Sequence, residues 1–351
     1  MTSLATRRLG SSGPEITRVG FGAWAAGGGG YAFGWGPQDD EDSLRAMRHA
    51  FERGINWIDT AAVYGLGHSE EVVGRLLREL PAGERPYIFT KCGMVWDEKN
   101  PTAQPRLDLR PESIRRECED SLRRLGVETI DLYQFHWPDE TGTPIEDSWG
   151  EMLRLVEEGK VRWAGVSNFD VPLLERCEAM RHVDSLQPPF SLIRREVAKA
   201  ELPWCAEHGT GVIVYSPMQS GLLTERWTLD RVNSLAPDDW RRGSSHFQSP
   251  NVERNLALRD ALGPVAERHG TSIASVAVGW ALALPGVTGA VVGARAPEQV
   301  DGWIDAASLE LAEEDLDEIP RAIQATGAGA GPAHPNEGAS SGARFAGASA
   351  R

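Results

Sequence analysis

The chain has 351 residues, of which 41% are hydrophobic and 25% charged, a composition typical of a globular protein with room for one large domain or two small ones. Its net charge of −15, from 36 basic and 51 acidic residues, argues against a nucleic-acid partner and against binding to an anionic membrane. The basic residues include only four lysines, so each lysine marks a position where the chain does not use its usual arginine: Lys91, Lys99, Lys160 and Lys199.

The cysteines and the chain ends indicate a cytoplasmic protein. No two of the four cysteines form a CxxC pair, and all lie in apolar segments, so we expect reduced core residues: Cys92, Cys118, Cys177 and Cys205. The N-terminal residues lack an apolar signal region, and no stretch reaches membrane-spanning length. The Gly/Ala/Ser-rich segment 325–351 predicts a disordered tail, which leaves residues 1–324 as a single domain.

In chain order, the sequence first predicts a β-hairpin, Arg7–Leu9 with Ile16–Arg18, and then alternates strand and helix signals. The predicted strands are Val19–Gly22, Trp57–Asp59, Tyr87–Cys92, Thr129–His136, Val161–Asn168, Ser185–Pro189, Gly211–Pro217 and Gly289–Gly293. The predicted helices are Asp40–Arg53, Ser69–Glu79 with Ser69 as its N-cap, Arg110–Gly126, Pro144–Lys160, Asp170–Met180, Lys199–His208, Val252–His269, Ser272–Leu284 and Pro297–Ile304.

Eight strands that alternate with helices predict an α/β fold, because strands joined through helices run parallel. We expect the closed (β/α)₈ TIM barrel, with a long loop after the seventh strand over Leu222–Asn251. No GxGxxG motif follows the first strand, and the glycines Gly27–Gly30 are interpreted as a mobile loop instead of a phosphate-binding turn.

Polar or special residues stand where the predicted strands end, which is where this fold carries its catalytic groups. These are Asp59, Lys91, His136, Ser167, Asn168, Gln187, Tyr215 and Gly293. A single Asp there is usually a helix cap and a single His usually a structural residue. Neighbouring strands, however, would bring Asp59, Lys91 and His136 into one small space, together with Tyr64 from the loop after the second strand.

Such a cluster suits proton donation. It has too few good ligands to hold a metal, and no Ser or Cys stands beside the histidine to act as a nucleophile. A free tyrosine is a poor acid at neutral pH, and a neighbouring ammonium lowers its pKa. We therefore expect Lys91 to lower the pKa of Tyr64, and Asp59 to hold Lys91 in place. A compact lysine fits behind a phenol better than a planar arginine does.

Seven segments in this order resemble the aldo-keto reductase family, and the resemblance covers about Arg7 to Leu316. The segments are GINWIDTAAVYG, FTKCG, DLYQFHWPD, GKVRWAGVSNF, QPPFS, VIVYSPMQSGLLT and VVGARAPEQV. The similarity is greatest to bacterial members with a long loop after strand seven. It implies reversible NAD(P)H-dependent reduction of an aldehyde or ketone by a catalytic tetrad of Asp59, Tyr64, Lys91 and His136, in which Tyr64 is the general acid and His136 orients the carbonyl.

The resemblance also implies a nicotinamide cofactor across the mouth of the barrel. Ser167, Asn168 and Gln187 would hold its carboxamide, Tyr215 would stack on its ring, and Ser216, Met218, Gly221 and Leu222 would line its pyrophosphate. The remaining implied cofactor contacts are Gly22, Trp24, Asp59, Gly293, Arg295 and Gln299.

The residues expected near the adenosine 2′-position bear on the choice between NADP(H) and NAD(H). Arg295 is well placed for the 2′-phosphate of NADPH, but Gly293 and Gln299 stand where strongly NADPH-selective members usually carry basic residues. Trp303 stands where an adenine-contacting asparagine is usual. These features predict a preference for NADP(H) and leave NAD(H) open.

The substrate is predicted only as a small-molecule carbonyl compound, with Trp24, Trp96 and Trp137 as an apolar wall. Arg226, Arg241 and Arg242 in the long loop could meet an anionic or sugar substrate, although a solvated charged loop is the more common case. Two other functions stay open. One is a cofactor-sensing regulatory protein, which would not need the complete tetrad; the other is a keto-sugar reductase of a biosynthetic pathway. The chain is expected to be a monomer or a small homo-oligomer.

Overall fold

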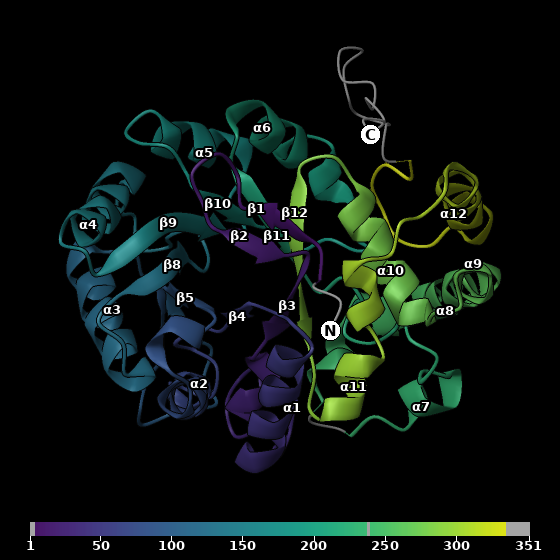
Figure 1. The fold of residues 1–351 in the computed structure, drawn as a ribbon, viewed down its shortest axis with the longest axis horizontal. Helices are drawn as coiled ribbons and strands as arrows, with labels where there is room; N and C mark the ends of the chain where they lie inside the picture. Colours follow the sequence, from purple (N-terminus) through teal and green to yellow (C-terminus); the bar gives the residue numbers. More distant parts are fainter. Residues whose placement is uncertain (1–3, 237–238, 335–351) are drawn as a thin grey trace.

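The structure is a computed structural model, and it describes residues 4–236 and 239–334. In this part of the chain, eight parallel strands form a closed barrel in which neighbours along the chain are neighbours in the sheet, as predicted (Figure 1). The strands are β3 (Val19–Gly22), β4 (Trp57–Asp59), β5 (Tyr87–Cys92), β8 (Ile130–Phe135), β9 (Val161–Ser167), β10 (Ser185–Gln187), β11 (Gly211–Tyr215) and β12 (Val287–Gly293). The predicted TIM barrel is thereby confirmed.

Helices surround the barrel, and several of them bury one apolar face against it. They are α1 (Asp40–Glu52), α2 (His68–Glu79), α3 (Pro111–Leu125), α4 (Ile145–Glu157), α5 (Val171–Glu178), α6 (Glu201–His208), α10 (Ile273–Ala283), α11 (Pro297–Asp301) and α12 (Glu313–Thr326). The long loop after β11 carries α7 (Leu229–Asn233), and α8 (Asn251–Ala261) and α9 (Gly263–His269) follow it.

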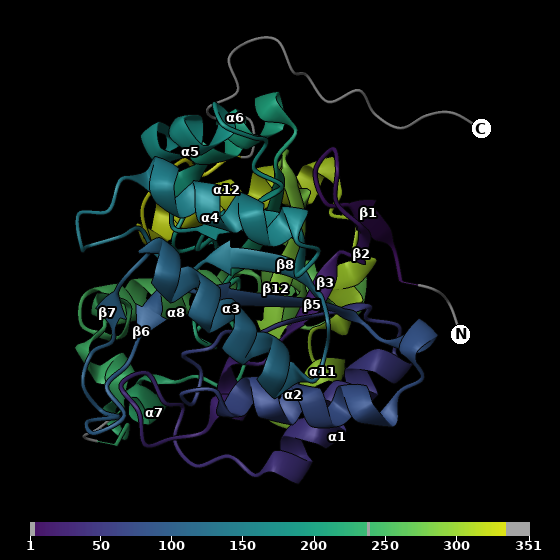
Figure 2. The same cartoon turned by 90° about the vertical axis from the view of Figure 1, so that its left-hand side faces the viewer.

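The N-terminal hairpin, β1 (Thr6–Arg8) with β2 (Glu15–Thr17), covers one end of the barrel. Its residues Leu9 and Ile16 are fully buried and pack with Trp57, Phe89 and Leu132 inside the barrel. The interior at this end is therefore a packed apolar plug. The opposite end, where the strands terminate, carries the hairpin of β6 (Met94–Val95) and β7 (Arg106–Leu107) together with α7 (Figure 2).

Two of the predicted helices differ from the structure for identifiable reasons. Helix α2 begins at His68 after Gly67, which has a φ of 103°, and Ser69 is not its cap. The Ser69 hydroxyl is buried and donates instead to the carbonyl of Ala23, so it ties the helix to the end of β3. The single helix predicted over Val252–His269 is two helices, because Pro264 interrupts the backbone hydrogen bonds.

The C-terminal segment is ordered further than predicted. Of the segment 325–351, residues 325–334 lie within the described part, and Ala328 and Ala333 are buried there. The buried guanidinium of Arg195 donates to the carbonyls of Ala328, Gly331 and Pro332, which fixes this stretch to the loop after β10. The remainder of the predicted tail, 335–351, lies outside the described residues. Over residues 4–236 and 239–334, no helix combines the length and apolar character that crossing a membrane requires.

Candidate active site

A cavity of about 830 Å³ opens at the C-terminal ends of the barrel strands. It is lined by most of the polar residues that the sequence places at strand ends: Asp59, His136, Ser167, Asn168, Gln187, Tyr215 and Gly293. Lys91 is not in the lining, because its side chain is buried beneath Asp59. The structure therefore brings the predicted strand-end residues together around one space.

Asp59 and Lys91 form a buried ion pair at the base of this cavity. The Lys91 Nζ donates to Asp59 Oδ1 over 2.5 Å and to the carbonyl of Thr60 over 2.9 Å. The other carboxylate oxygen of Asp59 accepts from Gln187 Nε2 at 2.8 Å. Burial lowers the pKa of Lys91, and the Asp59 carboxylate opposes that effect. An ammonium has three N–H donors, so one remains beyond the two used here.

Tyr64 and His136 lie beside this pair and contact each other. Their rings meet edge to face with centroids 5.6 Å apart, and Lys91 Nζ lies 5.3 Å from the centre of the Tyr64 ring. Neither side chain makes a hydrogen bond to another described residue. Both line the cavity, so the phenol hydroxyl and the imidazole are free to bind a polar group there.

The predicted direction of the net shift in the pKa of Tyr64 is wrong. Burial raises the pKa of Tyr64 well above its usual value of 10.0, and the negative charge of Asp59 raises it further. The sequence shows the neighbouring cation but not the burial, which is the larger effect. His136 shifts the other way, because burial and the Lys91 charge both lower the pKa of its imidazole well below 6.5. At neutral pH the site therefore holds a protonated phenol and a neutral imidazole.

Three polar side chains from the next strands form a hydrogen-bonded group. Asn168 Nδ2 donates to the carbonyl of His136 and to Ser167 Oγ, and Asn168 Oδ1 accepts from the hydroxyl of Tyr215 at 2.9 Å. Asn168 has a φ of 62°, a left-handed conformation that asparagine tolerates better than most residues. Gln187 joins the group through Asp59 and through its own carbonyl, which accepts from Ser167 Oγ at 2.7 Å.

The turn after β11 is strained at three residues. Ser216, Gln219 and Ser220 have φ values of 55°, 46° and 55°, and Gly221 follows at 93°. Left-handed non-glycine residues cost about 1–3 kcal/mol each and are concentrated where a backbone clamps a ligand. Ser216, Met218 and Gly221 line the cavity, whereas Leu222 is fully buried outside the lining.

The segment 293–303, from the end of β12 to just beyond α11, brings Gly293, Arg295, Gln299 and Trp303 to the cavity wall. Gln299 Oε1 accepts from the backbone N–H of Arg295, so this glutamine supports the turn. The Arg295 side chain bonds to the loop after β3, with Nε donating to Gln38 Oε1 at 2.6 Å. The buried Trp303 Nε1 has no hydrogen-bond partner among the described residues.

The aromatic residues of the cavity differ from the predicted set. Trp24 and Trp137 line it, but Trp96 does not, because Met94 and Leu107 of the β6–β7 hairpin hold that part of the wall. Two further tryptophans, Trp35 and Trp227, line the cavity and were not predicted; Trp35 contacts Trp24 at a centroid distance of 5.1 Å. They come from separate loops without strand or helix periodicity, so only the tertiary structure identifies them.

Arg241 joins two of these loops. Its guanidinium lies over the rings of Trp35 and Trp227, at 5.1 and 5.0 Å, and pairs with Asp239. Arg226 also lines the cavity, whereas Arg242 is outside the lining and donates to the carbonyl of Leu235. The long loop after β11 thus reaches the loop after β3 across the mouth of the barrel.

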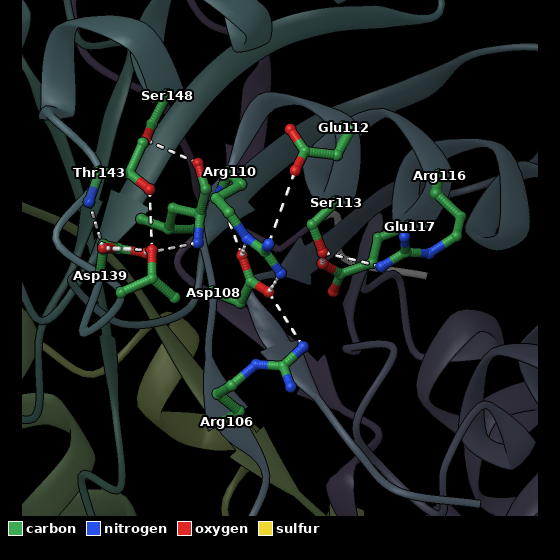
Figure 3. Close-up of polar contacts among 12 residues, drawn as sticks. Arg106, Asp108, Arg110, Glu112, Ser113, Arg116, Glu117, Asp139, Thr143 and Ser148 are labelled. Carbon is green, nitrogen blue, oxygen red and sulfur yellow. Dashed lines mark hydrogen bonds and ion pairs between the residues drawn. The ribbon is translucent and has the colours of Figure 1, made fainter.

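The wall formed by β6 and β7 is anchored by a polar cluster beneath it (Figure 3). Asp108 is fully buried and accepts from Arg106 of β7 and from Arg110. Asp139 accepts from the backbone N–H groups of Leu109 and Thr143, which fixes the loop after β8 against the same hairpin. This cluster holds the β6–β7 hairpin, with Met94 and Leu107, next to the loop that carries Trp137.

We expect the Asp108→Asn variant to be less stable and to bind substrate more weakly. The arginines lower the pKa of Asp108 to about 2, so its charge stabilises the fold fully above about pH 4 and loses this effect as the pH falls through about 2. Weakening such charge-assisted bonds costs about 1–3 kcal/mol. Urea unfolding at several pH values would measure this. A stability difference that stays constant from pH 7 to pH 2 would contradict the assignment.

Comparisons with known proteins agree with this architecture. The model of the aldo/keto reductase family matches residues 18–324. The chain is 34% identical over 319 residues to aldo-keto reductase YhdN of Bacillus subtilis, which covers 91% of this chain and 93% of that protein. It is also 34% identical to the NADH-specific methylglyoxal reductase of Escherichia coli, covering 88% of this chain and 94% of that one.

Solved structures give the same result. The glycerol dehydrogenase AKR11B4 from Gluconobacter oxydans superposes with a TM-score of 0.82 at 40% identity, covering 93% of this chain and 97% of that one. The holo form of the aldo-keto reductase AKR11C1 from Bacillus halodurans superposes with a TM-score of 0.75 at 25% identity. The match covers 91% of this chain and 96% of that one. Barrel, cavity and relatives agree that the chain belongs to the aldo/keto reductase family, oxidoreductases that act on carbonyl and alcohol groups with nicotinamide cofactors.

Proposed function

We propose that this protein reduces the carbonyl group of a small aldehyde or ketone with NADPH as the preferred cofactor, and that Tyr64 donates the proton. One observation carries this proposal. The Tyr64 hydroxyl and the His136 imidazole both line the cavity, and neither bonds to another described residue. Each offers a donor to the cavity, and a carbonyl oxygen of a bound substrate could accept from both.

The protonation states suit reduction. Because burial raises the pKa of Tyr64, the phenol keeps its proton at the pH at which it must donate it. As the carbonyl oxygen takes that proton, the developing phenolate gains from the nearby Lys91 ammonium, whose third N–H is available. Asp59 keeps the ammonium in place. His136, being neutral, can donate a ring N–H to the carbonyl without competing for the proton.

The residues around the cavity fit a dinucleotide. A bound nicotinamide would supply the hydride. Asn168, Gln187 and Ser167 offer amide and hydroxyl groups suited to its carboxamide, and Tyr215 lines the cavity beside them. The strained turn at Ser216 and Gly221 suits the pyrophosphate, as does its position after the seventh barrel strand.

The cofactor preference rests on Arg295. In the Arg295→Ala variant we expect kcat/KM with NADPH to fall by about 10–100-fold, in the range of a lost charged contact to a phosphate, and kcat/KM with NADH to change little. The measurement is steady-state kinetics with both cofactors. If the ratio between the two cofactors is the same in wild type and variant, Arg295 does not select NADPH, and the NADH-specific relative from Escherichia coli becomes the better guide.

The tryptophans that line the cavity favour some classes of carbonyl substrate over others. Trp24 and Trp137 line the cavity, and Trp24 stacks on the Tyr64 ring at a centroid distance of 5.9 Å. This favours carbonyl compounds with an apolar or aromatic group over strongly charged ones. Following the consumption of NADPH by absorbance with methylglyoxal, glyceraldehyde, benzaldehyde and a keto-sugar would test this preference. Turnover of the keto-sugar alone would favour the biosynthetic alternative, and no turnover with tight cofactor binding would favour a sensor.

A further inference from the structure

Beyond the reaction itself, we infer that Gln38 is a positioning residue for cofactor selectivity, which holds Arg295 ready for the 2′-phosphate of NADPH. This inference rests on the proposed function. Gln38 belongs to the loop between β3 and α1, and its amide group contacts Arg295 twice. Its Oε1 accepts from Arg295 Nε at 2.6 Å, and its Nε2 donates to the carbonyl of Arg295 at 3.1 Å. A reciprocal pair of this kind fixes both side chain and backbone of the arginine.

The rest of the guanidinium is held by the same loop. Arg295 Nη1 donates to the carbonyl of Trp35 at 3.4 Å, and Nη2 donates to the carbonyl of Pro37. A guanidinium has five N–H groups, so these contacts use one on each nitrogen and leave one on each of the two terminal nitrogens. Two N–H groups of Arg295 therefore remain for an anion, and arginine commonly binds a phosphate through two parallel N–H groups.

These contacts do not neutralise the positive charge of Arg295. In the described part of the chain, the Arg295 guanidinium donates only to neutral acceptors. These are the amide oxygen of Gln38 and the backbone carbonyls of Trp35 and Pro37. Neutral acceptors satisfy the geometry of the guanidinium but do not cancel its charge. An immobilised arginine with its charge uncompensated loses little conformational entropy on binding an anion and attracts it strongly.

Glutamine matters here because a carboxylate of the same shape would do the opposite. Glutamate at position 38 would pair with Arg295 Nε, cancel the charge and repel a 2′-phosphate. Gln299 cannot replace Gln38, since its Oε1 already accepts from the backbone N–H of Arg295. Gln38 is therefore the side chain of the loop after β3 that orients the Arg295 guanidinium without neutralising its charge.

The test compares Gln38→Glu and Gln38→Ala with Gln324→Glu, which makes the same change of charge on the exposed face of α12. Calorimetry would measure the dissociation constants of adenosine 2′,5′-bisphosphate and ADP, and kinetics would compare NADPH with NADH. We expect wild type and Gln324→Glu to bind the bisphosphate more tightly than ADP by about 10-fold or more, consistent with a bidentate phosphate contact. The preference for the bisphosphate over ADP should fall about 3–10-fold in Gln38→Ala. In Gln38→Glu the two nucleotides should bind equally well.

The outcomes distinguish the inference about Gln38 from the proposed role of Arg295 and from the proposed reaction. If the ratio is lost in Arg295→Ala but kept in both Gln38 variants, the inference about Gln38 is wrong and the role of Arg295 stands. If wild type does not distinguish the two nucleotides, both fail. Carbonyl reduction by wild type with either cofactor is a separate readout, and its absence would overturn the proposed function itself. Thermal unfolding of each variant identifies any loss that reflects misfolding.

Discussion

Replacing Tyr64 by phenylalanine should lower kcat for carbonyl reduction by about 10²–10⁴-fold, the usual contribution of a positioned general acid. The change deletes one hydroxyl. The ring of Tyr64 packs against Trp24 and His136, and phenylalanine keeps those contacts. We therefore expect the affinity for the cofactor and the thermal stability to stay close to wild type, so that the loss falls on the chemical step alone.

Tyr87→Phe is the matched control. Tyr87 begins β5, near the hairpin end of the barrel, and its ring contacts Trp163. Removal of its hydroxyl should leave the reaction rate unchanged. Single-turnover absorbance measurements of both variants, each saturated with cofactor, would report the chemical step directly. A Tyr64→Phe enzyme within a few-fold of wild type would rule out this phenol as the proton donor.

The Lys91→Met variant should lose both activity and stability. Lys91 and Asp59 are almost completely buried, at 1% and 2% exposure, so methionine leaves a buried carboxylate without its cation. Breaking such a pair costs about 3–5 kcal/mol. The phenolate that forms at Tyr64 also loses the ammonium near its ring, so kcat should fall by about 10²-fold or more.

A double variant separates the two effects. In Asp59→Asn with Lys91→Met no charge is left unpaired, so the free energy of unfolding should return toward the wild-type value. Activity should not return, because the ammonium is still missing. Urea unfolding and kinetics of both single variants and the double variant complete the thermodynamic cycle. Recovery of activity together with stability would show that Lys91 serves the fold and not the reaction.

The architecture and the composition of the cavity could be read from the sequence because each depends on local patterns. Strand and helix signals alternate through the chain, and parallel strands end on one face of a barrel. That geometry is sufficient to bring Asp59, Lys91 and His136 together. Similarly, the N-terminal hairpin follows from its short strands and the intervening Gly13-Pro14 turn.

What could not be predicted depends on contacts between distant segments. The two strands of the β6–β7 hairpin are each two residues long and have no measurable alternation. The contacts of Gln38 with Arg295 and of Trp35 with Trp240 join loops far apart in the chain. The direction of the Tyr64 pKa shift also depends on burial, which the neighbouring charges do not reveal.

The pH dependence of kcat/KM for carbonyl reduction tests the central claim most directly. Because the pKa of Tyr64 is raised, the proton-donating form is fully present below its ordinary value of 10.0 and is lost only as the pH rises through the higher, folded value. The lowered pKa of His136 keeps the imidazole neutral down to below 6.5. We predict a plateau from about pH 7 to beyond pH 9, with alcohol oxidation rising over the same range because it needs the phenolate. A reduction rate that falls tenfold per pH unit from below pH 8 would contradict the account.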